Sequence, residues 1–434
     1  MANLLASLRT SADMLRAYER GLEVVQNNIG NASTPGYARR EMALVAQRFN
    51  ADEAAAGGVL AGPIENTRSA FAERTVRRHL ETLGFSSAGS ELLAGIEAAF
   101  PISGESGVAG ALNRLFRGFS AWSLTPNDPN AREAVLEEAR GLSQAFADTA
   151  AQLAEASRLA ETRLGDTVRE INVLAGRLRD ANQEIRSGNR NDAGLDARIH
   201  ATLEELAELM DFTALEQPDG TYMVLAGGMV PLVVGDRHYP LSLAFARPED
   251  PVWPDGPVPA IVRDAGGADI TSKIRGGRLA GALDVRNNVL AGLIGDSRQP
   301  GDLNRLAVAV AERVNGLLAA GWTAAGAPPP EDLFHFDAFN HTAAARTFAV
   351  NPAFAAEMLA AADPGPPFVA NGTALQLVGL ATAADPSATI GGAGYMQFFA
   401  GMASRVGRLA GETRHAALRQ GRSEERRVGK ECRY

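Results

Sequence analysis

The sequence predicts an α+β fold that is mainly helical: an elongated helical bundle with a terminal coiled-coil segment and an inserted β-rich module. Three observations predict it. Alanine and leucine carry most of the apolar content, and aromatics are only 6 % of the 434 residues, which favours packing between helices. A heptad pattern occupies the N-terminal segment. Turn signals and short apolar runs interrupt the helical pattern after Asp211.

The N-terminal segment carries apolar residues at steps that alternate between four and three. This seam consists of Leu4, Leu8, Ser11, Leu15, Tyr18, Leu22, Val25 and Ile29. Charged residues lie off the seam, as in a coiled coil. Because so narrow a seam cannot bury itself, we expect a partner helix in the same chain or in another subunit. An ordinary amphipathic helix on a globular core has the same periodicity and is the alternative.

Glycine, asparagine and proline end this helix at 30–36, and the stretch 37–90 has no clear pattern. A helix is expected from about Leu112 to a turn at 125–130, and a long one from about 131 to 186. Asn182 lies on a heptad seam of the long helix, where it could fix the register or face solvent at the helix end.

A loop at 188–192 precedes a shorter helix with apolar residues from Leu195 to Met210 on one face. Strands are then expected at 221–225 and 231–234, bounded by turn residues. Helical patterns return from Asp302 and from about Tyr395.

These elements divide the chain into five segments. They are an N-terminal coiled-coil segment with its turn (1–60), a first helical part (61–210), a β-rich inserted module (211–290), a second helical part (291–420) and a C-terminal tail (421–434). The tail holds the only cysteine, Cys432, and has no apolar period, so we interpret it as foreign to the fold.

Composition excludes several classes of function. The net charge of −9 argues against nucleic acid as a partner, because phosphate binding needs a basic surface. No apolar run is long enough for a membrane span, and no cleaved signal peptide is visible. We find no catalytic, cofactor or metal motif and predict none, so the protein is not expected to be an enzyme.

The helix and its turn resemble the signature of flagellar rod, hook and hook-associated proteins. The residues that carry the resemblance are Asn27, Asn28, Asn31, Thr34, Pro35, Gly36 and Tyr37. Gly30 departs from that signature, which has alanine there, and should loosen the helix end. The signature does not separate rod, hook and junction members.

Internal segments resemble the hook-associated protein 1 family more specifically, and they occur in the family's order. They are 115–126, 131–136, 191–198, 219–221, 227–233 and 276–286. Each segment is a weak match alone, but together they cover most of residues 1–420.

The resemblance implies a structural subunit of a ring at the junction between hook and filament, outside the cell and exported without a cleaved signal. It implies contacts with copies of itself, the hook protein, a second hook-associated junction protein and an export chaperone. The alternatives are a rod- or hook-type axial protein, or an axial protein with a muramidase-like role.

Members of the family end in a second heptad helix that pairs with the first. Here 414–418 passes directly into the tail, so the chain resembles a copy truncated at the C-terminus. We therefore expect the N-terminal segment to be disordered in the free monomer, and the chain not to cap a hook until that helix is restored.

Overall fold

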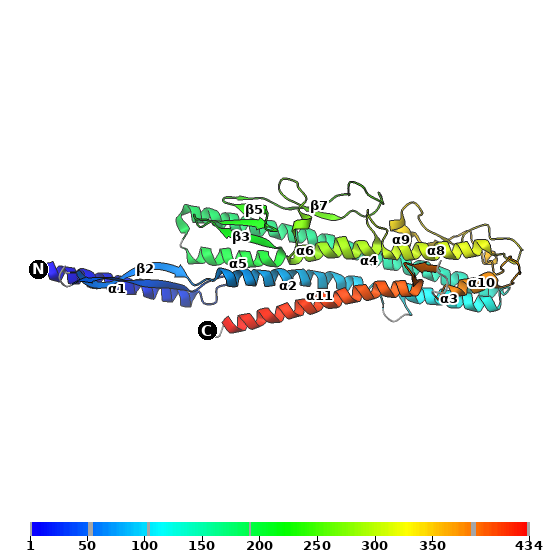
Figure 1. Ribbon diagram of the computed structural model, residues 1–434, viewed down its shortest axis with the longest axis horizontal. Helices are drawn as coiled ribbons and strands as arrows, with labels where there is room; N and C mark the ends of the chain where they lie inside the picture. Colours follow the sequence, from blue (N-terminus) through cyan, green and yellow to red (C-terminus); the bar gives the residue numbers. More distant parts are fainter. Residues whose placement is uncertain (1, 51–54, 102–104, 191, 383–387, 432–434) are drawn as a thin grey trace. The chain divides into compact units, whose positions relative to one another are not determined.

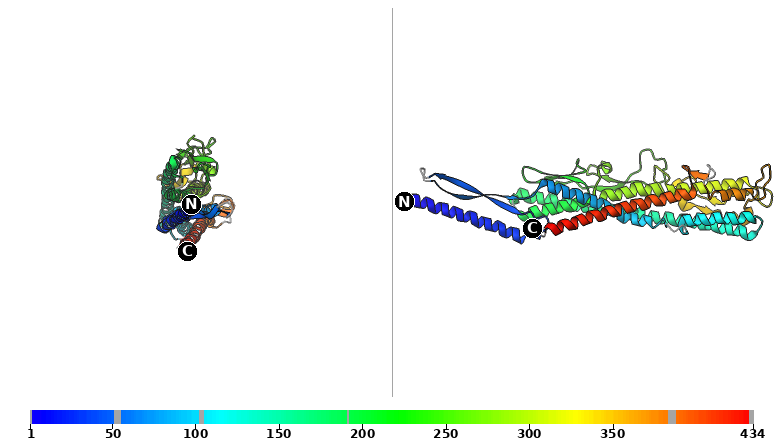
Figure 2. Two further views of the ribbon diagram at one scale, coloured as in Figure 1. Left: turned by 90° about the vertical axis from the view of Figure 1, so that its left-hand side faces the viewer. Right: turned by 60° about the horizontal axis from the view of Figure 1, so that its bottom comes forward.

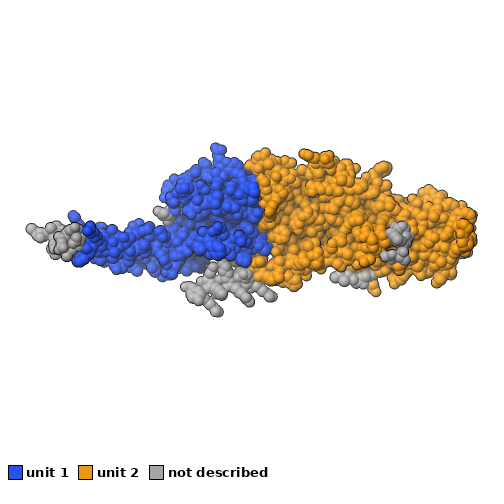
Figure 3. Space-filling model, in the orientation of Figure 1, with its two compact units in different colours: residues 1–82, 170–240 blue, residues 83–169, 241–434 orange. Residues whose placement is uncertain are grey.

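The computed structural model describes residues 2–50, 55–101, 105–190, 192–382 and 388–431, with the backbone alone at 2–6, 50, 55–56 and 422–431. The chain forms two compact units, residues 1–82 with 170–240 and residues 83–169 with 241–434 (Figure 3). The helices α2 (Ala70–Glu97) and α4 (Pro129–Glu184) contribute residues to both units.

The first unit begins with α1 (Ala2–Gly30), followed by a two-stranded antiparallel ribbon of β1 (Arg40–Asn50) and β2 (Ala55–Asn66). The ribbon packs along α1 and twists along its length (Figures 1 and 2). The sequence shows no clear pattern between 37 and 90, so neither this ribbon nor α2 was predicted. Glycines 57 and 58, both at positive φ, lie inside β2 and obscure the alternation that marks a strand.

The remainder of the first unit is α5 (Ala193–Leu209) and a four-stranded antiparallel sheet in the order β3-β4-β5-β6. Its strands are Phe212–Glu216, Tyr222–Ala226, Val230–Val234 and Arg237–His238. The strands expected at 221–225 and 231–234 are thus confirmed as β4 and β5. Gly220 at the β3–β4 turn has a φ of +85°, which suits glycine because it lacks a Cβ.

The position of Asn182, near the end of α4, differs from both alternatives that the sequence suggested. Its side chain is buried, accepts a hydrogen bond from the Tyr222 amide at 2.8 Å, and donates to the carbonyls of Tyr222 and Gly235 at 2.9 and 2.8 Å. Asn182 therefore joins α4 to the sheet. It neither fixes a coiled-coil register nor faces solvent.

The second unit is a helical bundle with small two-stranded sheets. Its helices are α3 (Gly107–Leu124), α6 (Gly277–Asp284), α7 (Ala291–Ile294), α8 (Asp302–Ala320), α9 (Ala344–Thr347), α10 (Gly372–Gly379) and α11 (Tyr395–Glu431). The paired strands are β7 (Ser242–Phe245) with β8 (Ala260–Arg263), β9 (Phe334–His335) with β10 (Ala349–Val350), and β11 (Thr389–Ile390) with β12 (Ala393–Gly394). Short π and 3₁₀ turns lie at 185–189, 271–273, 285–290, 341–343 and 356–358.

Its core contains large side chains from several helices, including Phe119 and Trp122 of α3, Phe146 of α4 and Tyr395 of α11. The predicted α+β, mainly helical class is confirmed. The long helix expected at about 131–186 is α4. The backbone of α11 stays helical to Glu431, through most of the segment interpreted as foreign.

Candidate functional site

The N-terminal helix α1 presents two parallel stripes, and its own ribbon covers only one. Ala17 is 1 % exposed. A Cβ added at Gly58 of β2 would lie 2.6 Å from Thr10 Cγ2, and one added at Gly21 would lie 3.5 Å from Met42 Cε of β1. The covered stripe is thus lined by small or flexible side chains, and glycine in the ribbon permits a close approach.

The predicted heptad seam lies on the other stripe. Its large apolar side chains are half or more exposed: Leu8, Leu15, Tyr18, Leu22, Val25 and Ile29. Ser11 is exposed as well, and the side chain of Leu4 lies outside the described residues. From Ser11 onward, each seam position directly follows a buried or half-buried position, and one residue is about 100° around a helix of 3.6 residues per turn. Among the described residues, therefore, no element covers the seam.

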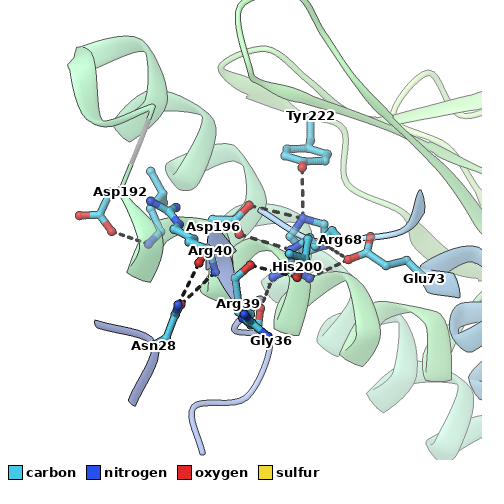
Figure 4. A network of polar contacts seen from close by, with 12 residues as sticks. Asn28, Gly36, Arg39, Arg40, Arg68, Glu73, Asp192, Asp196, His200 and Tyr222 are labelled. Atoms are coloured by element: carbon cyan, nitrogen blue, oxygen red, sulfur yellow. Dashed lines mark hydrogen bonds and ion pairs between the residues drawn. The ribbon is translucent and has the colours of Figure 1, made fainter. Parts of the chain in front are cut away.

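Asn28 joins the end of α1 to the start of the ribbon. Its Oδ1 accepts hydrogen bonds from the Tyr37 hydroxyl and from the Arg40 amide, both at 2.9 Å, and its Nδ2 donates to the Arg40 carbonyl at 2.9 Å. One side chain thus satisfies both backbone groups of the first residue of β1 (Figure 4).

Asn31 and Thr34 close the turn that follows α1. The Nδ2 of Asn31 donates to the carbonyl and the Oδ1 of Asn27 at 3.0 and 2.9 Å, and the Thr34 hydroxyl donates to Asn31 Oδ1 at 3.2 Å. The Tyr37 amide donates to the Thr34 carbonyl at 3.1 Å. The polar residues of the family motif therefore hold the chain reversal, and Pro35 between them is exposed.

Gly36 brings the turn against α5. Its φ is +73°, and a Cβ there would lie 2.9 Å from the backbone nitrogen of Ala201 and closer still to the carbonyl of Ala197. Only glycine fits both the backbone conformation and this contact.

Arg68, between β2 and α2, connects this turn to the helices. Its guanidinium donates to the Gly36 carbonyl, to Glu73 Oε1 at 2.6 Å and to Asp196 Oδ2 at 3.3 Å. Arg77 donates to the other oxygen of Glu73 at 2.8 Å. This network could not be predicted from the sequence, because residues 68–77 carry no motif and Asp196 is distant from them in sequence.

His200 of α5 completes the network between α2 and the sheet. Its Nδ1 lies 2.9 Å from Glu73 Oε1, and its Nε2 lies 3.2 Å from the Tyr222 hydroxyl. Burial acts to raise the pKa of Glu73, but hydrogen bonds and charge from His200 and Arg68 outweigh it and lower the pKa to about 2. Burial raises the pKa of Tyr222, with carboxylates nearby adding to the effect.

This arrangement holds the turn after α1 against α5. The carboxylates of the network are engaged with cations, so they position the turn. Among the described residues, no cluster of three or more histidine, cysteine, aspartate or glutamate side chains could hold a metal ion. In the described part of the chain, every helix is too short or too polar to span a lipid bilayer.

Comparison with known proteins places the chain in a family. Residues 93–334 match the sequence model of the flagellar hook-associated protein FlgK helical domain, which is more than half of the chain. The chain belongs to this family. The matched segment begins after the N-terminal helix and its turn, so the family assignment rests on the helical body.

Curated relatives agree with the family. The flagellar hook-associated protein 1 of Bacillus subtilis is 22 % identical over 55 % of this chain and 50 % of its own length. The proteins of the same name from Salmonella typhimurium and Escherichia coli are each 26 % identical, over 72 % and 74 % of this chain and 56 % and 58 % of theirs. The chain thus spans about half the length of the curated relatives that it matches.

A solved structure shows the same fold. The flagellar hook junction protein FlgK from Burkholderia pseudomallei superposes with a TM-score of 0.69 at 15 % identity, covering 82 % of this chain and 99 % of that one. The resemblance to the hook-associated protein 1 family is confirmed.

Proposed function

We propose that the chain is a structural subunit of the bacterial flagellum at the junction between hook and filament, assembled through the exposed seam of α1. The observation that carries the proposal is the pair of stripes on α1. Its own ribbon occupies one stripe, and six large apolar side chains stand exposed on the other. Family membership supports the location, since the relatives are named as hook-associated and junction proteins.

The energetics of the seam are consistent with assembly. Full burial of a large apolar side chain contributes roughly 1.5–3 kcal/mol. Six such side chains together are comparable to the about 4–15 kcal/mol that association costs in lost freedom. One seam contact is therefore marginal for a pair of chains, and a ring in which each subunit contacts two neighbours gains from closure.

The partners follow from this placement. They are copies of the chain in a ring, the hook protein on one side and a second hook-associated protein on the other. A protein with an exposed apolar helix also needs an export chaperone before assembly, because such a surface aggregates. The proposed role is mechanical and not enzymatic, and the proposed location is extracellular, reached by export without a cleaved signal peptide.

Immunogold electron microscopy of shed flagella tests the location. Gold confined to the boundary between hook and filament is the expected result. Gold along the hook, or on the rod, would indicate a hook- or rod-type protein and would overturn the assignment to the junction.

A further inference from the structure

We propose that the first unit contains an oxyanion-binding site, in a cavity of about 480 Å³ at the base of the α1–ribbon arm. Three arginines from separate parts of the chain line it: Arg20 of α1, Arg40 of β1, and Arg190 after α4. The ligand class is a group bearing carboxylate or phosphate oxygens. This inference does not depend on the proposed function.

Two of the three arginines that line the cavity, Arg20 and Arg190, are available for a ligand. Within the described residues, neither Arg20 nor Arg190 has an ion pair or a hydrogen bond, and both are exposed. Neighbouring Arg186, by contrast, has carboxylate partners in Asp219 at 3.5 Å and Asp236 at 3.8 Å. The planar guanidinium group matches the geometry of carboxylate and phosphate with two parallel hydrogen bonds.

The Arg190 side chain packs on one side against the β3–β4 turn. A Cβ added at Gly220 would lie 2.9 Å from Arg190 Nε and 3.2 Å from its Cγ and Cδ. The side chain therefore lies flat on the β3–β4 turn, where glycine leaves room for it. A side chain that already packs on one side loses less freedom when it binds a ligand than one surrounded by solvent.

The charge balance of the lining favours an anion. Three arginines face two carboxylates, Asp196 and Glu216. Asp196 already forms an ion pair with Arg68 at 3.3 Å, so its negative charge is partly neutralised (Figure 4). The whole chain carries a net charge of −9, so an arginine-rich cavity runs against the average charge. By this count the lining carries an excess of one positive charge, and a net positive lining attracts ligands of the opposite sign.

The volume of the cavity sets the size of the ligand. At about 30 Å³ per water, it holds roughly sixteen waters, more than one carboxylate or phosphate group needs. A pair of acidic side chains from a second copy of this chain, or a free polyanion, fits this chemistry. Both would bind through the same arginines.

The test is isothermal titration calorimetry of the full chain with pyrophosphate and with citrate at low ionic strength. We expect both to bind the wild-type chain, and the double variant R20A/R190A to bind at least tenfold more weakly. R237A, which removes an exposed arginine of β6 outside the cavity, should bind like wild type. No binding to the wild-type chain, or equal binding to R20A/R190A, would overturn the proposal.

A second variant covers the case in which R20A/R190A does not fold. R190Q keeps a polar side chain at an exposed position, and a weakening of several-fold is expected from it alone. Unchanged affinity for pyrophosphate in a folded R190Q chain would also overturn the proposal.

Sedimentation of the chain with and without pyrophosphate separates the two sources of the ligand. If acidic side chains of a second copy fill the cavity, pyrophosphate reduces self-association of the wild-type chain and leaves that of R20A/R190A unchanged. If the ligand is a free oxyanion, self-association does not respond to pyrophosphate. Either pattern supports the site, provided that the calorimetry detects binding.

Discussion

At the residue scale, asparagine side chains fix helices to strands by a repeated device. In each case the side-chain amide bonds both the N–H and the C=O of one strand residue, at 2.7–3.0 Å. The pairs are Asn28 with Arg40, Asn182 with Tyr222, Asn287 with Ala260, and Asn315 with Phe334. No sequence pattern identifies the strand residues that these asparagines bond, because the partner strand is identifiable only after folding.

Asn28 lies in the N-terminal signature that the sequence resembles, and its removal should loosen the arm formed by α1 and the β1–β2 ribbon. We expect Asn28→Ala to cost about 1–3 kcal/mol, because the backbone groups of Arg40 lose a part-buried partner. Hydrogen exchange of peptides that contain the Arg40 amide should rise clearly. Gln26→Ala, at an exposed position of the same helix, is the control and should leave exchange unchanged. Equal exchange in the two variants would show that Asn28 does not hold the arm.

Glu73 should make stability depend on pH in the acid range. Its pKa in the folded chain is about 2 against an ordinary 4.5, so the folded state favours the ionised form. The stabilisation is fully present above pH 4.5 and is lost as the pH falls towards 2. Glu73→Gln should lower the Tm at pH 7, and the difference from wild type should shrink between pH 4.5 and 2. A difference that stays constant with pH would contradict the ion network.

Glu81, eight residues further along α2, should behave in the opposite way. Burial, with the nearby charge of Asp211, raises its pKa to about 7, so the folded state favours the protonated form. Stability is then lost as the pH rises from 4.5 through 7. Glu81→Gln should raise the Tm at pH 8 and give no gain at pH 4, as measured by thermal unfolding. A variant that is less stable than wild type at pH 8 would refute this interpretation.

At the element scale, the long helix α4 was predictable, and the ribbon and α2 were not. The helix α4 follows from a sustained apolar period and from the turn residues that precede it. The β1–β2 ribbon lacks those signals. Its strands contain glycine where the ribbon approaches α1, and its pairing shifts register between Met42 and Leu44, so a two-residue alternation is broken.

Substitution of two glycines of the arm by alanine should change the free energy of unfolding in opposite directions. Gly58→Ala introduces a Cβ 2.6 Å from Thr10 at a φ of +130°, so it should destabilise the arm by more than 1 kcal/mol. Gly30→Ala meets no neighbouring atom within 4 Å and should stabilise the chain by about 0.4–1 kcal/mol. Urea unfolding measures both. A loss of stability in Gly30→Ala would contradict the account of the helix end.

For the candidate site, the seam positions were predictable from the sequence, and the contacts around them were not. The positions of the seam follow from the heptad period alone. The period could not reveal that the ribbon packs on a second stripe, one residue earlier. Thr10 is polar, and Ala17 and Gly21 are small, so these residues do not mark an apolar face. Nor could it reveal Arg68, Glu73 and His200, which depend on contacts between distant segments.

At the scale of the whole molecule, the central claim is that a helix with one face occupied by its own ribbon presents the other face to a flagellar neighbour. The helical body carries the family assignment, and the arm carries the proposed assembly surface. Seam substitutions should then affect assembly and leave the folding of the chain unchanged, because the seam is exposed in the free chain.

The most direct test is binding of the labelled chain to isolated hooks that lack their junction protein, visualised by electron microscopy. We predict saturable label at the hook tip for the wild-type chain, since binding to the tip does not require a complete cap, and loss of that label in the double variant L15S/L22S. The matched control E19S/E23S, at exposed charged positions on the same helix, should bind as wild type does, and all three chains should unfold at the same temperature. Label at the tip in L15S/L22S equal to wild type, or none with the wild-type chain, would contradict the claim.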